Sequence, residues 1–239
     1  MCGPGNIFNN VMQFKDRYEA GRKLAAVLRE TVVKHTGNGG KEDMLLLALP
    51  RGGVPVASEI AKALSLPFDV LLVRKIGIPG QDELAMGAIA WGEIQYLNQD
   101  LIKQMQIPDS AVEQVVAREK EELSRRNRLY RGDRPVLAID GKTIIVVDDG
   151  LATGATMHAA VEALKEANAG RIIVAVPVGA ADTCQKLQED KVVDVVCLHI
   201  PEPFYGVGRW YEDFSQTSDE EVLGLLAKSA PGVQGNEQT

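Results

Sequence analysis

The sequence predicts an α/β protein in which a central parallel β-sheet is covered by helices on both faces. Two observations lead to this fold class. Short runs of β-branched and other apolar residues recur along the chain, and segments with helical spacing of apolar residues lie between them. Strands that alternate with helices form right-handed βαβ units, and strands without polar alternation are typical of a parallel sheet buried on both faces.

The expected elements follow from these patterns. Continuous apolar runs predict the sheet strands, at residues 44–49, 69–73, 143–147, 171–176 and 194–199. Periodic apolar stripes predict the helices, at residues 17–33, 54–64, 108–128 and 180–188 and in a segment that carries Met157, Val161 and Leu164. Glycine and proline predict an irregular loop over residues 74–87, before two short strands at 88–91 and 93–97. Polar composition predicts a loop at 35–43 and a disordered tail at 230–239.

Composition and charge argue against several classes of protein. The 239 residues carry a net charge of −7, which is unlike a general nucleic-acid binder. No apolar run reaches membrane-spanning length, and the first residues lack the basic and apolar regions of a secretory signal. Cys2, Cys184 and Cys197 have no metal-ligand spacing and are expected to be reduced thiols of a cytoplasmic protein.

The most informative segment is residues 143–157, TIIVVDDGLATGATM. Asp148 and Asp149 end a buried strand, and a turn of small residues leads into a helix. Such a turn can offer backbone N–H groups and hydroxyls to a phosphate. The adjacent carboxylates can accept hydrogen bonds from ribose hydroxyls or hold a hydrated Mg²⁺. A purely structural turn is the alternative, but it does not require two aspartates followed by Thr-Gly-Ala-Thr.

This segment resembles the phosphoribosyl-diphosphate (PRPP) signature of type I phosphoribosyltransferases. The resemblance implies the type I phosphoribosyltransferase fold and Mg²⁺ as cofactor. It also implies a reaction in which a 5-phosphoribosyl group passes from PRPP to a nitrogen acceptor and pyrophosphate is released. Asp148 and Asp149 would be catalytic, holding the ribose hydroxyls and the metal. The remaining PRPP-binding residues of the turn would be Gly150, Leu151, Ala152, Thr153, Gly154, Ala155 and Thr156. Ala152 departs from members with aspartate there, so no general acid or base is expected at this position; adenine-specific members also have alanine.

A second turn, Pro50-Arg51-Gly52-Gly53, follows the first expected sheet strand. Ligands of open parallel sheets bind beyond the carboxyl ends of the strands, and glycine permits close backbone approach to a charged group. By the same resemblance Arg51, Gly52 and Gly53 would bind the pyrophosphate of PRPP, in a loop that often contains a cis non-proline peptide in this family. The alternative is an ordinary strand-to-helix turn.

Arg74 and Lys75 close the next expected strand, where two cations suit an anionic leaving group. The irregular loop that follows is expected to be a mobile lid, poorly ordered without ligand. The resemblance implies that the matching loop closes over PRPP. Arg74 would then bind PRPP, and Lys75 would be catalytic by contacting pyrophosphate. The alternative is a solvated basic pair on the surface.

Aromatic residues make up 5% of the protein, yet four of them lie between positions 204 and 211. Such a cluster after the last strand favours a platform for a flat acceptor. The segment is similar to the hood of hypoxanthine–guanine phosphoribosyltransferases, which makes Phe204, Tyr205 and Trp210 the candidate acceptor-binding residues. Those enzymes carry a lysine after the preceding strand, whereas residues 176–179 here read VPVG. The sequence therefore argues against a 6-oxopurine and does not identify the acceptor.

From position 14 to position 222 the chain resembles a bacterial group of phosphoribosyltransferases with an unassigned acceptor. One domain is expected, with a core at about residues 44–200 and a hood from about 1–40 and 200–225, and a homodimer is typical of the family. The arginines at 125, 126, 128, 131 and 134 are interpreted as a solvated helix end, with a phosphate-facing role as the alternative. Two rival functions stay open: a non-catalytic PRPP or nucleotide sensor, and a phosphohydrolase of a phosphoribosyl compound.

Overall fold

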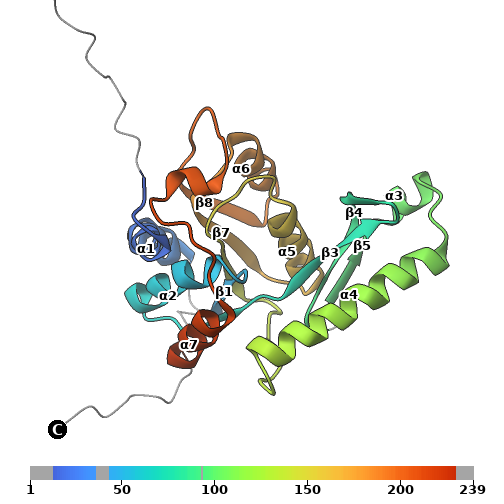
Figure 1. The fold of residues 1–239 in the computed structure, drawn as a ribbon, viewed down its shortest axis with the longest axis horizontal. Helices are drawn as coiled ribbons and strands as arrows, with labels where there is room; N and C mark the ends of the chain where they lie inside the picture. The colour runs from blue at the N-terminus through green and yellow to red at the C-terminus, as the bar shows by residue number, and fades with distance from the viewer. Residues whose placement is uncertain (1–12, 36–42, 93, 230–239) are drawn as a thin grey trace, which may run out of the picture.

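The computed structural model describes residues 13–35, 43–92 and 94–229. A five-stranded sheet forms the centre of the molecule, and a smaller three-stranded sheet stands beside it (Figure 1). The elements in chain order are α1 (Arg17–His35), β1 (Met44–Ala48), α2 (Gly53–Leu64), β2 (Phe68–Val70), β3 (Val73–Ile78), β4 (Gln81–Ala90), β5 (Ile94–Leu97), α3 (Gln99–Gln104), α4 (Asp109–Tyr130), β6 (Thr143–Val147), α5 (Ala155–Glu166), β7 (Arg171–Val178), α6 (Ala181–Gln188), β8 (Val193–His199), the 3₁₀ helix η2 (Val207–Trp210) and α7 (Asp219–Ser229).

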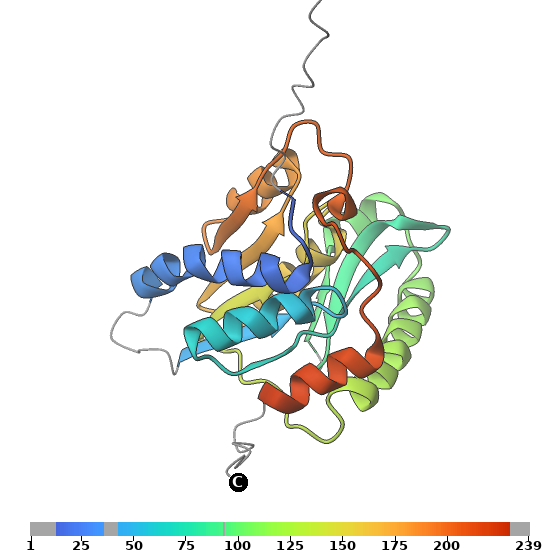
Figure 2. The same cartoon turned by 60° about the vertical axis from the view of Figure 1, so that its left-hand side comes forward.

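The central sheet has the strand order β2-β1-β6-β7-β8, and every neighbouring pair is parallel. The predicted fold class is therefore confirmed, as are the positions of most predicted strands and helices. Helices α1 and α2 lie on one face of this sheet, and α5 and α6 lie on the other (Figures 1 and 2). Most of the predicted loop at 35–43 and the whole predicted tail at 230–239 lie outside the described residues.

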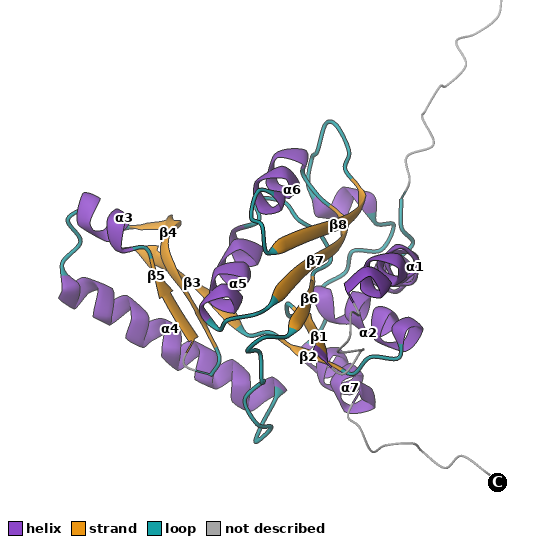
Figure 3. Ribbon diagram, turned by 180° about the vertical axis from the view of Figure 1, so that it is seen from behind, coloured by secondary structure: helices purple, strands orange, loops and turns teal. Residues whose placement is uncertain are grey.

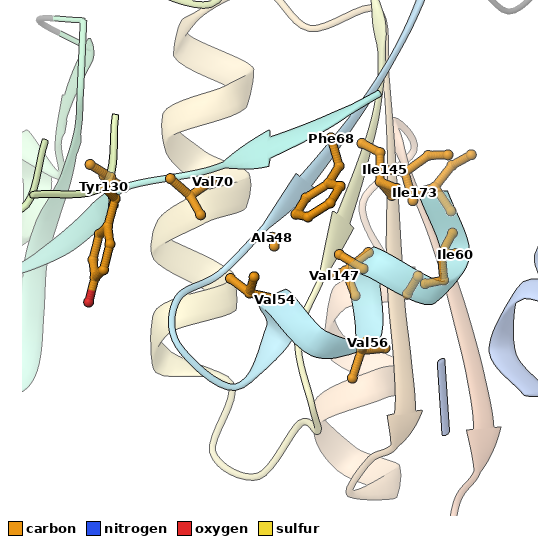
Figure 4. Packing of buried hydrophobic residues seen from close by; sticks show 14 of the residues in the cluster. Ala48, Val54, Val56, Ile60, Phe68, Val70, Tyr130, Ile145, Val147 and Ile173 are labelled. Atoms are coloured by element: carbon orange, nitrogen blue, oxygen red, sulfur yellow. The ribbon is translucent and has the colours of Figure 1, made fainter. Parts of the chain in front are cut away.

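Alternation of side chains along the strands builds a core on each face of the sheet. Ile145 and Val147 of β6 belong to the cluster that includes Val56 and Ile60 of α2 (Figure 4). Their neighbours Ile144 and Val146 belong to a second cluster, which includes Met157, Ala160, Val161 and Leu164 of α5. Because successive side chains of a strand point to opposite faces, the run of four apolar residues at 144–147 fits a strand covered on both sides.

The smaller sheet corrects one sequence prediction. Residues 74–87 were expected to form an irregular loop, but β3 and β4 pair antiparallel and form a hairpin closed by Pro79 and Gly80. The predicted strand at 69–73 is divided: its first residues belong to β2 of the central sheet, and Val73 begins β3 of the smaller sheet. β5 pairs with β4, and α4 packs along this sheet, which projects from the central one (Figure 3).

The N-terminal segment meets the segment that follows β8 beside the central sheet. Phe14 bridges to Tyr211, with a 2.8 Å hydrogen bond from its backbone N to the carbonyl of Trp210. The final helix, α7, packs against α2, α4 and β2. Within the described residues, none of the helices combines the length and the apolar character needed to cross a membrane.

Candidate functional site

Two turns come together at one point of the sheet edge. β1 and β6 are parallel neighbours in register, with Ala48 opposite Val147 and a 2.8 Å hydrogen bond from Leu49 N to the Val147 carbonyl. After β1 the chain runs to one side of the sheet through β2, and after β6 it runs to the other side through β7 and β8. The turns after β1 and β6 therefore flank the topological switch point, where ligands of open α/β sheets bind.

The turn after β6 leads directly into the amino end of α5. Gly154 is the residue before this helix, and its φ of +72° is a conformation that favours glycine. The first N–H groups of a helix have no partner inside the helix and attract anions. A small cavity of about 170 Å³ lies here, lined by Asp148, Val207 and residues 150–157. We call residues 150–156 the phosphate turn, because its backbone geometry suits a phosphate group.

The phosphate turn is held from behind by the segment between β7 and α6. Leu151 N donates to the Val178 carbonyl at 2.8 Å, and Ala180 N donates to the Leu151 carbonyl at 2.8 Å. The Thr183 hydroxyl donates to the Ala152 carbonyl at 2.7 Å. These three bonds fix the turn before any ligand arrives, which lowers the entropic cost of binding.

The acidic pair lies between the two turns. Asp149 Oδ2 accepts a 2.8 Å hydrogen bond from Arg17 Nε, and the Asp149 carbonyl accepts one of 2.6 Å from the Tyr211 hydroxyl. Asp148 Oδ1 accepts from Asp149 N at 2.8 Å. Burial, and then repulsion from Asp149, raises the pKa of Asp148 well above its usual value. Burial also raises the pKa of Asp149, against the opposing effect of Arg17.

The raised pKa of Asp148 predicts how this carboxyl group affects the stability of the folded protein. An ionised carboxyl with a raised pKa destabilises the folded state at neutral pH, and this cost decreases as pH falls through the raised pKa. Asp148→Asn removes the charge and should raise Tm at pH 7 by about 2–4 °C, the shift expected from ~1 kcal/mol in a domain of this size. Its Tm should also depend less on pH than that of the wild type. Calorimetry at pH 5 and pH 7 checks both, with the exposed Asp133→Asn as control; a lower Tm at pH 7 would contradict the assignment.

The second cavity is larger and basic. It encloses about 470 Å³ between the turn after β1, the start of β3, one face of α4 and the phosphate turn. Its charged lining consists of four cations and one carboxylate: Arg74, Lys75, Arg118, Arg126 and Glu119. Thr153, Ala155 and Thr156 line both cavities, so the two cavities adjoin at the phosphate turn. A net positive cavity next to a phosphate turn suits a ligand with more than one phosphate group.

The predicted residues of the turn after β1 lie at the same edge. The Pro50–Arg51 peptide bond is cis, in agreement with the expectation for this loop. Gly52 faces the Asp149 carboxylate so closely that a methyl group there would collide with it. A methyl group at Gly53 would lie 2.9 Å from Asp148 Cα. The Arg51 side chain instead extends toward α7, where its Nη1 lies 3.4 Å from Asp219 Oδ1.

The cations on β3 and α4 differ in their surroundings. Arg74 pairs with the buried Glu119 at 2.8 Å, and Lys75 lines the basic cavity. The interpretation of the α4 arginines as a solvated helix end is wrong for two of them. Arg126 lines the cavity while pairing with Glu122 at 2.8 Å, and Arg131 is buried and pairs with Asp69 at 3.1 Å.

The predicted acceptor residues lie farther from the cavities. Phe204 is half-buried, Tyr205 is 74% exposed, and Trp210 is buried with its ring centroid 4.7 Å from that of His199. None of these three side chains lines either cavity. From the same segment, Val207 lines the phosphate-turn cavity.

Several residues of the site were not identified from the sequence. Arg17 reaches Asp149 from the start of α1, and its guanidinium lies 4.0 Å from the ring centroid of Phe214. Tyr211 is 62 residues from its partner Asp149 along the chain, and Glu119 is 45 residues from its partner Arg74. Such contacts leave no local pattern in one sequence. The aromatic cluster at 204–211 was a signal for Tyr211, but it did not distinguish Tyr211 from its neighbours.

The site also has to fit Mg²⁺. Among the described residues no group of three or more histidine, cysteine, aspartate or glutamate side chains is arranged to hold a metal ion. Mg²⁺ usually retains waters and is held by one or two carboxylates together with substrate phosphates. Asp148 and Asp149 fit that description, because they are adjacent, partly buried and next to the phosphate turn.

The central parallel sheet carries the acidic pair and the phosphate turn at its switch point, an arrangement suited to a sugar phosphate. A family model for the phosphoribosyl transferase domain matches residues 15–208. The chain belongs to this family.

Particular relatives agree with that assignment. Two Mycobacterium tuberculosis proteins, from strains CDC 1551 / Oshkosh and ATCC 25618 / H37Rv, are named "Putative phosphoribosyl transferase"; each is 40% identical over 216 residues, 90% of this chain. The chain spans 47% of the length of each. The crystal structure of TT1426 from Thermus thermophilus has a TM-score of 0.79 and 38% identity, covering 92% of this chain and all of TT1426.

Proposed function

We propose that this chain transfers the 5-phosphoribosyl group of PRPP to a nitrogen acceptor and releases pyrophosphate. The observation that carries the proposal is the meeting of two turns at the switch point, one with the acidic pair and the phosphate turn, the other with closely packed glycines. Family membership supports the same chemistry. PRPP carries a 5-phosphate and a pyrophosphate on one ribose, which matches a phosphate turn next to a basic cavity.

In this proposal the residues hold three parts of PRPP. Backbone N–H groups and hydroxyls of Thr153 and Thr156 bind the 5-phosphate. Asp148 and Asp149 accept hydrogen bonds from the ribose hydroxyls and stabilise the positive charge that develops on the ring as the C1–O bond breaks. The turn after β1 and Lys75 bind the departing pyrophosphate. Mg²⁺, when bound, supplies further neutralisation of the pyrophosphate charge.

Arg17 has a defined place in this account. Without ligand it neutralises Asp149, whose carboxylate is otherwise close to Asp148 and to the Gly52 backbone. When PRPP binds, Asp149 would instead accept hydrogen bonds from the ribose hydroxyls, and Mg²⁺, where bound, would supply positive charge beside it. The guanidinium then remains between Phe214 and the reaction centre, where it can face the acceptor.

Pyrophosphate release tests the function and separates it from its rivals. The full chain is incubated with PRPP, Mg²⁺ and a panel of nitrogen bases, and pyrophosphate is measured. The proposal expects release that depends on one base and yields the matching nucleotide. Release without any base would favour a phosphohydrolase, and PRPP binding without release would favour a sensor.

Lys75→Ala should lower kcat more than PRPP affinity. Lys75 lies near the start of β3 and lines the basic cavity. Pyrophosphate gains charge as the C1–O bond breaks, so its interaction with Lys75 is strongest in the transition state. A loss of about 10²–10³ in kcat is typical for one such electrostatic contact. Steady-state kinetics and calorimetry check this prediction, with Lys75→Arg as the charge-preserving control. Equal losses in kcat and PRPP affinity would remove Lys75 from the chemical step.

Phe204→Ala should weaken binding of the acceptor or of the product nucleotide and leave PRPP affinity nearly intact. Stacking of a base on an aromatic ring contributes about 1–3 kcal/mol. The control is Tyr96→Ala, an aromatic replacement on β5, outside the cluster at 204–211. If PRPP affinity falls as much as acceptor affinity, Phe204 is a packing residue of the cluster around Phe14 and Trp210.

Three broader expectations belong to the same proposal. The chain is one domain with a core at about 44–200 and a hood from its terminal segments, it forms a homodimer, and it works in the cytoplasm. The contact between Phe14 and Tyr211 supports a hood in which both terminal segments take part. Light scattering of the purified chain measures the oligomeric state.

A further inference from the structure

Two cysteines face each other behind the phosphate turn. Cys184 lies on α6 and Cys197 on β8, and both residues line the same surface cavity. Their sulfurs approach the same point of the backbone: a methyl group at Gly179 would lie 2.7 Å from Cys184 Sγ and 3.2 Å from Cys197 Sγ. Two thiols that approach one point from two elements of the fold are a candidate dithiol rather than two isolated core residues.

The pair is accessible to a small reagent. Cys184 is buried and Cys197 is half-buried, and both line a surface cavity of about 300 Å³. The other residues of this cavity are Ala181, Gln185, Gln188, Val195 and Ile200, none of which is charged. A small neutral oxidant such as hydrogen peroxide fits such an opening.

The two thiols differ in reactivity. The neighbouring Cys197 thiol lowers the pKa of Cys184, and the interaction with Cys184, followed by burial, raises the pKa of Cys197. Because the thiolate is the nucleophile, Cys184 is the thiol that attacks and Cys197 the one that resolves. In the resting state the Cys197 thiol donates a hydrogen bond to the His199 carbonyl at 3.2 Å.

Backbone and side-chain contacts connect the surroundings of the two cysteines to the phosphate turn. Thr183, next to Cys184, donates the hydrogen bond to the Ala152 carbonyl. Gly179, against which both sulfurs lie, bridges to Leu151 of the same turn. The sulfurs of a disulfide are about 2.05 Å apart, so bond formation draws α6 toward β8. That movement displaces Thr183 and loosens the support of the turn.

We propose that Cys184 and Cys197 form a peroxide-sensitive dithiol whose disulfide loosens the phosphate turn. The Cys184 thiolate attacks one oxygen of hydrogen peroxide, the O–O bond breaks, and protonation of the leaving hydroxide gives water and a sulfenic acid on Cys184. The Cys197 thiol then attacks that sulfur and releases a second water. In sum, two thiols and one peroxide give one disulfide and two waters.

The experiment uses the full chain with Cys2→Ser, so that only this pair can react. The protein is treated with hydrogen peroxide, digested without reduction and analysed by mass spectrometry, and amide exchange is measured over residues 148–156 and 178–184. The expected result is a linked pair of peptides containing Cys184 and Cys197, a mass lower by two hydrogens, and severalfold faster exchange of the phosphate turn. A thiol reductant should reverse all three.

Cys184→Ser and Cys197→Ser are the matched controls and should show no change in exchange after peroxide. Absence of the linked peptides in the parent protein would overturn the proposal. A disulfide that leaves exchange of the phosphate turn unchanged would overturn it as well. Neither readout requires PRPP, so failure here is distinct from failure of the proposed transferase activity.

Discussion

Replacing both aspartates of the acidic pair by asparagine should abolish measurable PRPP affinity or weaken it at least about 100-fold. A hydrogen bond to a charged group contributes about 1.5–3 kcal/mol, and each carboxylate is placed to accept from the ribose or to hold the metal. Two such losses together exceed the ~2.7 kcal/mol that corresponds to 100-fold in affinity. Asparagine keeps the shape of the side chain, so Asp149 N retains an acceptor at position 148.

Calorimetric titration with PRPP and Mg²⁺ checks this effect. Asp133→Asn, at an exposed position on the loop after α4, is the control and should bind like the wild type. The double variant should also remain folded, because burial makes the two charges costly rather than stabilising. PRPP affinity equal to that of the wild type would remove the acidic pair from the binding site.

Gly52→Ala should weaken PRPP binding at least about tenfold, although the side chain added is one methyl group. The backbone of Gly52, with φ −61° and ψ −33°, is open to any residue, so the effect does not come from strain at this position. It comes from the Asp149 carboxylate, which the new methyl group displaces from its place beside Arg17. A misplacement of about 1 Å in a positioned group can cost 10²-fold in rate.

Gly224→Ala on α7 is the matched control, because nothing lies within 4 Å of a methyl group at that position. It should bind PRPP normally and be slightly more stable, since alanine favours a helix over glycine by ~1 kcal/mol. Unchanged PRPP affinity in Gly52→Ala would show that the contact between the two turns does not position Asp149.

The sequence predicted the central sheet well, for a physical reason. A strand buried on both faces has to be continuously apolar, and β6 and β7 show that pattern in one local run. The phosphate turn was visible for a similar reason, because small residues, threonines and aspartates are concentrated within a few positions. Its supporting contacts from Ala180 and Thr183 were not visible.

The hairpin of β3 and β4 was missed because Gly77, Pro79, Gly80 and Gly87 were interpreted as signs of an irregular loop. Only two of them, Pro79 and Gly80, form the turn. Gly87 lies within β4, where a methyl group would collide with the Tyr96 carbonyl of the neighbouring strand. Close approach of two strands is a tertiary requirement, and a single sequence does not distinguish it from loop composition.

The basic residues were misjudged for a related reason. Arg131 ends a charged helix and has the local pattern of a solvated cation, yet it is buried against Asp69 of β2. Glu119 likewise looks like one charge among many, but it is the buried partner of Arg74. These ion pairs join α4 and the residue after it to β3 and β2, and no local pattern specifies that arrangement.

A crystal structure of the full chain with PRPP and Mg²⁺ would show whether PRPP binds across the two turns at the switch point. We predict the 5-phosphate on the N–H groups of residues 153–156, the ribose beside Asp148 and Asp149, and the pyrophosphate between the Pro50–Gly53 turn and Lys75. PRPP bound elsewhere, or held only by the α4 side of the basic cavity with the phosphate turn empty, would contradict it.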